Sequence, residues 1–288
     1  MNGRTVLRLA RLGLHLLWGM LQALLVLPLV RRLPLRVAVP VRQHLVQRWL
    51  RQLLAVLGVR LEVAGAAVRG PLLLVANHVS WLDVAVIGAV RPGCFVAKSE
   101  VGGWPLIGWL ARRAGTLFVA RGVGEANRVV ADTMTFQLRR GESVVLFPEG
   151  TTGTGETVGR FHARFYQAAL RAGVPVQPAA LRYADGPSVA FVGEEAFVAN
   201  LLRLLRMPRI HARLNLCAPL ALAGLDRRAL AETSREAVCT ALAREGDRQL
   251  SSVGGFPSPD NRIPTGSSAS ANRASAGPSE SRDCEAGA

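Results

Sequence analysis

The chain has 288 residues, of which half are hydrophobic, 6% are aromatic and 19% are charged, and its formal net charge is +15. This length suits one large domain with appendages, and the charge favours an anionic partner. Scarce aromatic residues and arginines placed beside an apolar stretch argue against nucleic acid, while four widely spaced cysteines and five scattered histidines indicate neither a disulfide framework nor a metal site.

The N-terminal part of the chain is both basic and apolar. Its first sixty residues hold ten arginines and no acid, and the first acidic residue is Glu62. Residues 12–30 carry no formal charge and as a helix would reach about 28 Å, against a hydrocarbon core of roughly 30 Å. Residues 41–57 then show helical periodicity. We expect residues 1–58 to form a membrane-associated helical segment that faces an anionic membrane surface.

Three arrangements of this segment stay open. Arginines flank the apolar stretch on both sides, so the distribution of positive charge assigns no orientation to a membrane span. The same flanks suit a helical pair that lies in one leaflet with both ends on the same side. The third arrangement is a pair of ordinary core helices.

From residue 59 the pattern changes to short apolar runs that alternate with helical stretches, which predicts an α/β fold with a mixed, largely parallel central sheet flanked by helices. The predicted strands are residues 59–63, 72–76, 94–97, 116–120, 143–147, 174–181, 189–192 and 210–216. The predicted helices are residues 81–90, 104–113, 125–140, 161–172, 197–206 and 227–248. This domain is expected to cover residues 59–249, and the Ser-, Gly- and Pro-rich residues 250–288 are expected to be a disordered tail.

The stretch VANHVSWLD, residues 75–83, places a histidine where a predicted strand ends and an aspartate where a helix begins. Ligands bind at the carboxyl ends of strands in open α/β sheets, so His78 would face a cleft. The turn lets the Asp83 carboxylate reach back to the imidazole, which fixes the tautomer of a general base. The alternative is structural, since Ser80 to Asp83 also fits a helix capping box and Asn77 fits a turn.

Three further stretches end at the same edge of the predicted sheet. In LFPEGTTGTG, residues 146–155, a glycine with hydroxyl neighbours offers donors to a phosphate or glycerol oxygen, although a tight polar loop explains it as well. In GTLFVAR, residues 115–121, a strand delivers Arg121, whose guanidinium can hold a phosphate with two hydrogen bonds. In FVAKSEVGGWPLIGWL, residues 95–110, Lys98 is the only lysine of the chain.

NHVSWLD, the segment from Lys98 to Gly108 with the following G-x-x-F-V-x-R, FPEGT and VPVQPAAL resemble, in this order, the four blocks of the glycerolipid acyltransferase superfamily. The similarity is greatest to its bacterial 1-acylglycerol-3-phosphate acyltransferase branch and covers roughly residues 60–220.

The resemblance implies transfer of a fatty acyl group from acyl-CoA or acyl-carrier protein to the hydroxyl of a lysophospholipid. His78 would be the base and Asp83 would orient it. No metal or cofactor is implied, because a thioester is already activated. The positions that the resemblance associates with acceptor binding are Gly115, Phe118, Arg121, Glu149, Gly150 and Thr151. Site support is expected from Asn77, Lys98, Pro175 and Pro178.

The acceptor identity depends on details that depart from the family pattern. FHARF stands at residues 161–165 where an F-K-x-G-like stretch is common, and Thr152 stands where serine is common. The resemblance favours 1-acylglycerol-3-phosphate, with another lysolipid such as a lyso-ornithine lipid as the alternative. A basic membrane-binding or nucleic-acid-binding protein without catalysis is the distant alternative. The expected location is the inner membrane of the cell, with the site facing the cytoplasm.

Overall fold

The computed structural model describes residues 2–119 and 125–253, and within them the centre of the protein is one seven-stranded sheet. Its order is β1-β7-β6-β2-β5-β3-β4, and every neighbouring pair is parallel except β6 with β7. The predicted mixed, largely parallel sheet is therefore confirmed. The strands are β1 Val59–Ala64, β2 Leu73–Ala76, β3 Cys94–Lys98, β4 Leu117–Val119, β5 Val144–Leu146, β6 Val176–Tyr183 and β7 Ile210–Leu216.

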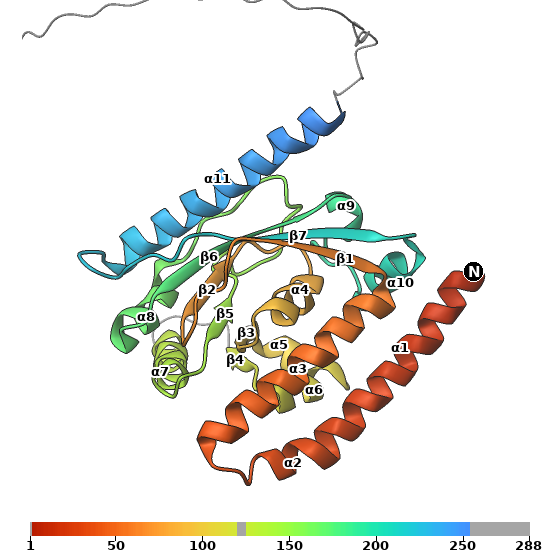
Figure 1. Ribbon diagram of the computed structural model, residues 1–288, viewed down its shortest axis with the longest axis horizontal. Coiled ribbons are helices and arrows are strands. Elements are labelled where there is room, and N and C mark those ends of the chain that lie inside the picture. The colour runs from red at the N-terminus through yellow and green to blue at the C-terminus, as the bar shows by residue number, and fades with distance from the viewer. Residues whose placement is uncertain (1, 120–124, 254–288) are drawn as a thin grey trace, which may run out of the picture.

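Helices cover both faces of the sheet (Figure 1). One core cluster lies between the sheet and α1, α3, α4 and α10, and the other lies between the sheet and α7, η2, α8 and α11. The helices are α1 Gly3–Leu21, the π-helical η1 Gln22–Val26, α2 Leu27–Val30, α3 Leu35–Leu57, α4 Leu82–Val90, α5 Ser99–Gly102, α6 Ile107–Ala114, α7 Glu125–Arg139, the 3-10 helix η2 Ala163–Tyr166, α8 Gln167–Ala172, α9 Gly186–Val189, α10 Phe197–Arg206 and α11 Arg227–Val253.

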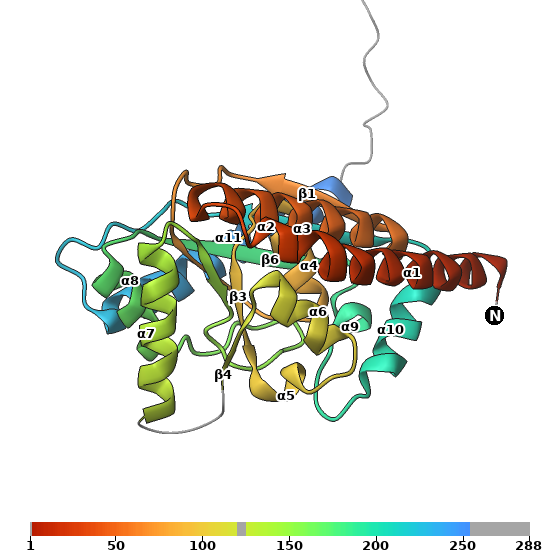
Figure 2. The same ribbon diagram turned by 90° about the horizontal axis from the view of Figure 1, so that it is seen from below.

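The N-terminal segment is a helical hairpin along one side of the molecule (Figure 2). One helical run extends from Gly3 to Val30 and is long and apolar enough to cross a membrane by length and composition. Its π-helical turn lies directly before Pro28, whose ring nitrogen cannot donate to the preceding turn. Most of its apolar side chains are exposed, with Leu14 at 68% and Leu25 at 63%, so this run is not an ordinary core helix.

Both ends of the hairpin are attached to the same part of the body. Arg8, near the start of α1, donates to the carbonyl oxygens of Leu205 in the last turn of α10 and of Met207 and Pro208 just after it. Gly58, which ends α3, has a positive φ of 76°, and a Cβ there would lie 1.9 Å from Nη2 of Arg8. The start of α1 and the end of α3 therefore meet at one place on the body, and α3 packs on α4 between Gln47 and Leu57.

Two predicted elements differ from the structure. Residues 189–192 are not a strand: Val189 ends α9, and the amide of Phe191 donates to the carbonyl of Val79. Val189 and Ala190 are buried and Val192 is exposed, so this apolar run covers a loop and does not extend the sheet. The helix predicted at residues 104–113 is present, but it begins later than predicted. Pro105 precedes a tight turn at Leu106, with φ 62° and ψ −57°, and α6 begins only at Ile107.

The last helix ends further along the chain than the predicted residue 248. The last helix continues to Val253, and the rest of the expected disordered tail, residues 254–288, lies outside the described residues.

Candidate functional site

Two adjacent parallel strands bring the two central motifs together. His78 follows the carboxyl end of β2, and Glu149 follows the carboxyl end of β5, which pairs with β2. This is a topological switch point of the sheet, because β5 and β6 lie on opposite sides of β2. A crevice at such a switch point is the usual ligand site of an open α/β sheet.

His78 and Asp83 are in direct contact. Nδ1 of His78 lies 2.7 Å from Oδ2 of Asp83, and the imidazole stacks on the ring of Phe147 with centroids 3.9 Å apart. The histidine side chain keeps 19% of its surface exposed, whereas that of Asp83 is fully buried. A carboxylate can only accept, so Nδ1 carries the proton and Nε2 presents its lone pair as a base.

Asp83 combines the two roles that its sequence position suggested. Its Oδ2 also accepts from the backbone amides of Val79 at 2.7 Å and Ser80 at 3.0 Å. The bond from Ser80 is one half of a capping box at the start of α4. One oxygen therefore holds the turn and orients the imidazole, so the capping explanation and the orienting explanation are not exclusive.

Tyr183, which the sequence motifs did not indicate, completes the surroundings of Asp83. Its hydroxyl donates to Oδ1 of Asp83 at 2.8 Å. Burial, followed by the negative charge of Asp83, raises the pKa of Tyr183 well above its usual value, so the phenol stays a donor. The available signal was composition, since Tyr183 is one of two tyrosines in the chain and lies two residues beyond a predicted apolar strand.

Asn77 is buried and ties β2 to β6 beyond their last paired residues. Its amide nitrogen donates to the carbonyl oxygen of Leu181, and its carbonyl oxygen accepts from the amide of Leu181, both at 2.8 Å. These two bonds continue the parallel ladder that ends at Ala76 and Ala179. Asn77 thus fixes the backbone from which His78 projects.

Glu149 braces the histidine loop through both carboxylate oxygens. Oε1 accepts from the amide of His78 at 2.8 Å, and Oε2 accepts from the amide of Gly159 at 2.7 Å. Burial raises the pKa of Glu149, and the two amide bonds oppose that rise. In this structure the side chain is bonded to the protein backbone, so its geometry is that of a positioning group.

The loop after Glu149 wraps around the histidine loop. Gly150 has φ 72°, a left-handed conformation that suits glycine in this turn, and Thr151 is exposed beside it. The amide of Gly153 donates to the carbonyl oxygen of His78 at 2.8 Å. The hydroxyl of Thr152 donates to the carbonyl oxygen of Phe191. The hydroxyl of Thr152 is thus used within the protein, whereas Thr151, the last residue of the FPEGT motif, is exposed.

Gly115 has a structural explanation. It ends α6 with φ 98°, and a Cβ there would lie 1.9 Å from Nη1 of Arg42. That arginine donates to the carbonyl oxygen of Ala114 at 2.9 Å and forms an ion pair with the buried Glu142. The contact links helix α3 to the turn that enters β4.

Phe118 and Lys98 lie on the neighbouring strands β4 and β3, at positions that do not face each other. β3 and β4 pair with Ala97 opposite Phe118 and Lys98 opposite Val119. The guanidinium of Arg112 lies 5.3 Å from the centroid of the Phe118 ring. Arg121, which follows β4 in the sequence, lies outside the described residues.

The two prolines of the last motif are not equivalent. Pro178, in β6, pairs with Val75 of β2, which lies three residues before His78. Pro175 precedes β6, and its carbonyl oxygen accepts from the amide of Leu73 at the opposite end of the strand. At about 3.3 Å per residue it lies roughly 20 Å from the level of His78.

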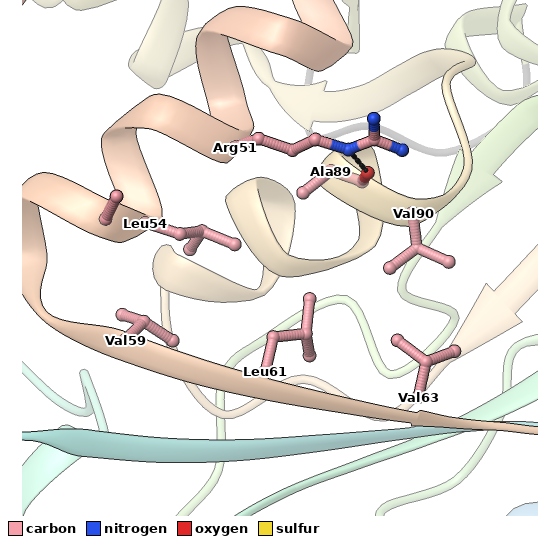
Figure 3. A pocket seen from close by; sticks show the side chains of 8 residues that line it. Arg51, Leu54, Val59, Leu61, Val63, Ala89 and Val90 are labelled. Carbon is pink, nitrogen blue, oxygen red and sulfur yellow. Dashed lines mark hydrogen bonds between the residues drawn. The ribbon is translucent and has the colours of Figure 1, made fainter.

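A cavity of about 490 Å³ opens between α3, β1 and the end of α4 (Figure 3). Its walls are apolar except for Arg51, whose Nε donates to the carbonyl oxygen of Ala89 at 2.7 Å. His78 precedes the other end of the nine-residue α4, about 13 Å away along the helix. Elsewhere in residues 2–119 and 125–253, no group of three His, Cys, Asp or Glu side chains is placed to hold a metal ion.

Comparison with known proteins agrees with this arrangement. A family model described as acyltransferase matches residues 58–182. The lyso-ornithine lipid O-acyltransferase of Pseudomonas aeruginosa is 45% identical over 215 residues, which cover 73% of this chain and 83% of that protein. The 1-acyl-sn-glycerol-3-phosphate acyltransferase of Neisseria meningitidis is 36% identical over 211 residues, covering 68% and 80%.

A solved structure shares the fold. The crystal structure of the 1-acyl-sn-glycerophosphate acyltransferase from Thermotoga maritima superposes with a TM-score of 0.61 at 18% sequence identity. The superposition covers 84% of this chain and 95% of that chain.

Proposed function

We propose, from the premise that the chain belongs to the acyltransferase family and acts on lysolipids, that His78 is the general base of acyl transfer to a lysolipid hydroxyl. The observation that carries this proposal is the contact of 2.7 Å between His78 and the buried Asp83. It leaves Nε2 as the basic nitrogen on the exposed side of a strand-end site.

The reaction balances with these groups alone. Nε2 of His78 takes the proton of the acceptor hydroxyl while the oxygen attacks the thioester carbonyl, and a tetrahedral oxyanion forms. Collapse of this intermediate breaks the carbon–sulfur bond, and the imidazolium returns its proton to the leaving thiolate. The products are an ester and a free thiol. A positioned base contributes about 10²- to 10⁴-fold to such a step.

Asp83 supports the base in two ways. Its carboxylate keeps the proton on Nδ1, and its charge stabilises the imidazolium that exists between the two proton transfers. Because the side chain is buried and accepts four hydrogen bonds, it cannot turn away from the ring without leaving several donors unpaired.

We propose acyl-CoA or acyl-carrier protein as the donor, since either supplies an activated thioester, and no ATP, metal or protein nucleophile enters the scheme. For the acceptor, the 45% identity to the Pseudomonas protein supports a lyso-ornithine lipid. The sequence motifs favour 1-acylglycerol-3-phosphate, and it stays the second candidate because the Neisseria protein is 36% identical. Arg121 would hold the phosphate of that second acceptor.

We also propose that the enzyme works on the cytoplasmic face of the inner membrane. The exposed apolar side of the N-terminal hairpin would enter one leaflet, where the acceptor is found, and the surrounding arginines would meet anionic headgroups. The thioester donors arrive from the cytosol.

The test of the base is His78→Ala in an acyl-transfer assay with labelled acyl-CoA and labelled acyl-carrier protein. We expect transfer to fall by at least about a hundredfold, since the alanine variant has no base at this position. Membrane association and thermal stability should match wild type. His211→Ala, at an exposed position of β7, is the matched control and should be fully active.

Activity of His78→Ala within a few-fold of wild type would refute the assignment. The same assay with lyso-ornithine lipid and 1-acylglycerol-3-phosphate decides the acceptor. A preference for 1-acylglycerol-3-phosphate would reverse the order of the two candidates and leave the chemistry unchanged.

A further inference from the structure

We propose that Tyr183 is a positioning residue of the acyl transfer, which holds the Asp83 carboxylate in the orientation that serves His78. This inference rests on the proposed function and extends the pair His78–Asp83 to a chain of three side chains. The chain begins on β6, at the last residue of the strand, and ends at the imidazole.

The two oxygens of Asp83 are used differently. Oδ2 accepts from Nδ1 of His78 and from the amides of Val79 and Ser80. Oδ1 accepts from the hydroxyl of Tyr183 at 2.8 Å, and among the described residues this is its one hydrogen bond. The phenol is therefore what distinguishes the two oxygens and directs Oδ2 toward the ring.

Burial makes this bond important. Asp83 is 0% exposed and Tyr183 is 4% exposed, so solvent does not replace a lost donor. A buried carboxylate oxygen without a partner binds a proton more strongly or turns toward another donor. Either change weakens the hold of Asp83 on Nδ1 of His78.

The position of Tyr183 is itself well defined. β6 lies between β2 and β7, and Tyr183 pairs with Ala212 across the antiparallel side. Two residues earlier, Leu181 forms both bonds to Asn77, directly before His78. One strand thus fixes the two ends of the loop: Leu181 holds its start at Asn77, and Tyr183 holds its end at Asp83.

Few other charged or titratable groups face this pair. Glu149 bonds to the amide of His78 from the loop after β5, and His162 lies behind it, with Cδ2 3.7 Å from a Cβ built on Gly150. Both stay in place when the hydroxyl of Tyr183 is removed. A change in the pH dependence of Tyr183→Phe therefore reports on His78 and Asp83.

The expected effect has two parts. Loss of a hydrogen bond to a charged group lowers kcat by about ten- to a hundredfold in Tyr183→Phe. The acidic limb of the kcat/KM profile moves to higher pH. A carboxylate that has lost a donor has a greater proton affinity, so the coupled pair takes up its first proton at a higher pH, on whichever side chain that proton resides.

The experiment is a double-mutant cycle. Wild type, Tyr183→Phe, Asp83→Asn and the double variant are assayed with acyl-CoA and the preferred lysolipid, and melting temperatures are recorded for each. Tyr166→Phe is the matched control, because Tyr166 is the other tyrosine, is fully buried and ends η2 in the other core cluster. If Tyr183 acts through Asp83, its substitution costs little further activity once Asp83 is Asn.

Opposite results overturn the proposal. Tyr183→Phe with the activity and pH profile of Tyr166→Phe would show that the phenol is dispensable. Losses that add in the double variant, accompanied by an unshifted acidic limb, would show a merely structural role. His78→Ala is measured in parallel: if it is inactive beside a fully active Tyr183→Phe, only Tyr183 is misassigned, whereas a fully active His78→Ala removes the proposed base and the role of Tyr183 with it.

Discussion

The side chain of Glu149 joins two loops of the site through both of its carboxylate oxygens. Its two oxygens accept hydrogen bonds from the amides of His78 and Gly159. A Cβ on Gly159 would lie 2.8 Å from Oε2. The carboxylate fills the space between the two loops. The FPEGT motif therefore holds the loop that carries His78 in place through Glu149. The exposed part of the motif is the turn at Gly150 and Thr151.

We predict that Glu149→Gln lowers kcat/KM by about tenfold. Glutamine has one carbonyl oxygen and bonds one of the two amides, so the other is left without a carboxylate acceptor. Steady-state kinetics measures this. Glu156→Gln, in the same loop but exposed, is the control and should not differ from wild type.

The same substitution has a pH signature in stability. Burial raises the pKa of Glu149 above its usual value of 4.5, so its ionised form is less favourable in the folded than in the unfolded state. The wild-type protein should lose stability relative to Glu149→Gln as pH rises from 4.5 through the raised pKa. Melting temperatures measured in parallel across this range check the sign, and a difference that grows in favour of wild type with rising pH would contradict it.

Among the elements, the N-terminal hairpin is the one whose placement decides how the enzyme meets a membrane. Arg4 donates to the carbonyl oxygen of Arg206, and Arg8 donates to three carbonyl oxygens on either side of it. The start of α1 is thereby held on the body that carries His78. A transmembrane α1 would place Gly3 and α10 on opposite sides of the bilayer, which breaks these bonds.

We therefore predict that the hairpin lies in one leaflet. A cysteine introduced at Gly3 and one introduced at Arg228 on α11, each in a background without native cysteines, should react with an impermeant maleimide from the same side of sealed vesicles. In inverted inner-membrane vesicles both should be labelled. Labelling of position 228 but not of position 3 would establish a span.

At the scale of the whole molecule, charge and apolar surface act together. The net charge is +15, and the exposed apolar side chains gather on α1, η1, α2 and the start of α3. Each basic residue close to an anionic surface contributes about 1 kcal/mol, and this contribution is screened by salt. Burial of apolar side chains in the interface is not screened.

We predict that salt reduces, but does not abolish, binding to vesicles that contain phosphatidylglycerol. The salt-resistant part should be lost in a variant that carries Leu14→Gln, Leu25→Gln and Leu29→Gln. The matched control is Val129→Gln with Phe136→Gln, two exposed apolar positions on α7. Flotation at low and high salt measures both. Equal losses in the two variants would show that the hairpin is not the membrane-binding surface.

Much of this protein was determined by local sequence. Alternation and short apolar runs predicted all seven strands of the sheet to within about two residues at each end, because both patterns follow burial. The motifs placed His78 and Asp83 at a strand end and a helix start, and a turn is a local feature. The sequence also indicated the basic, apolar hairpin, although not the early start of its first helix at Gly3.

Only the tertiary structure decided which residues distant in sequence come into contact at the site. The bonds from Tyr183 to Asp83 and from His78 to Glu149 span about a hundred and about seventy residues, and no local pattern encodes which strand becomes the neighbour of β2. The apolar run at 189–192 resembles a strand because a short apolar sequence can pair in a sheet or cover a loop, and local pattern does not distinguish the two. Strand order is set by the packing of two helical layers against one sheet, and that packing brings β6 beside β2 and the phenol of Tyr183 to the carboxylate.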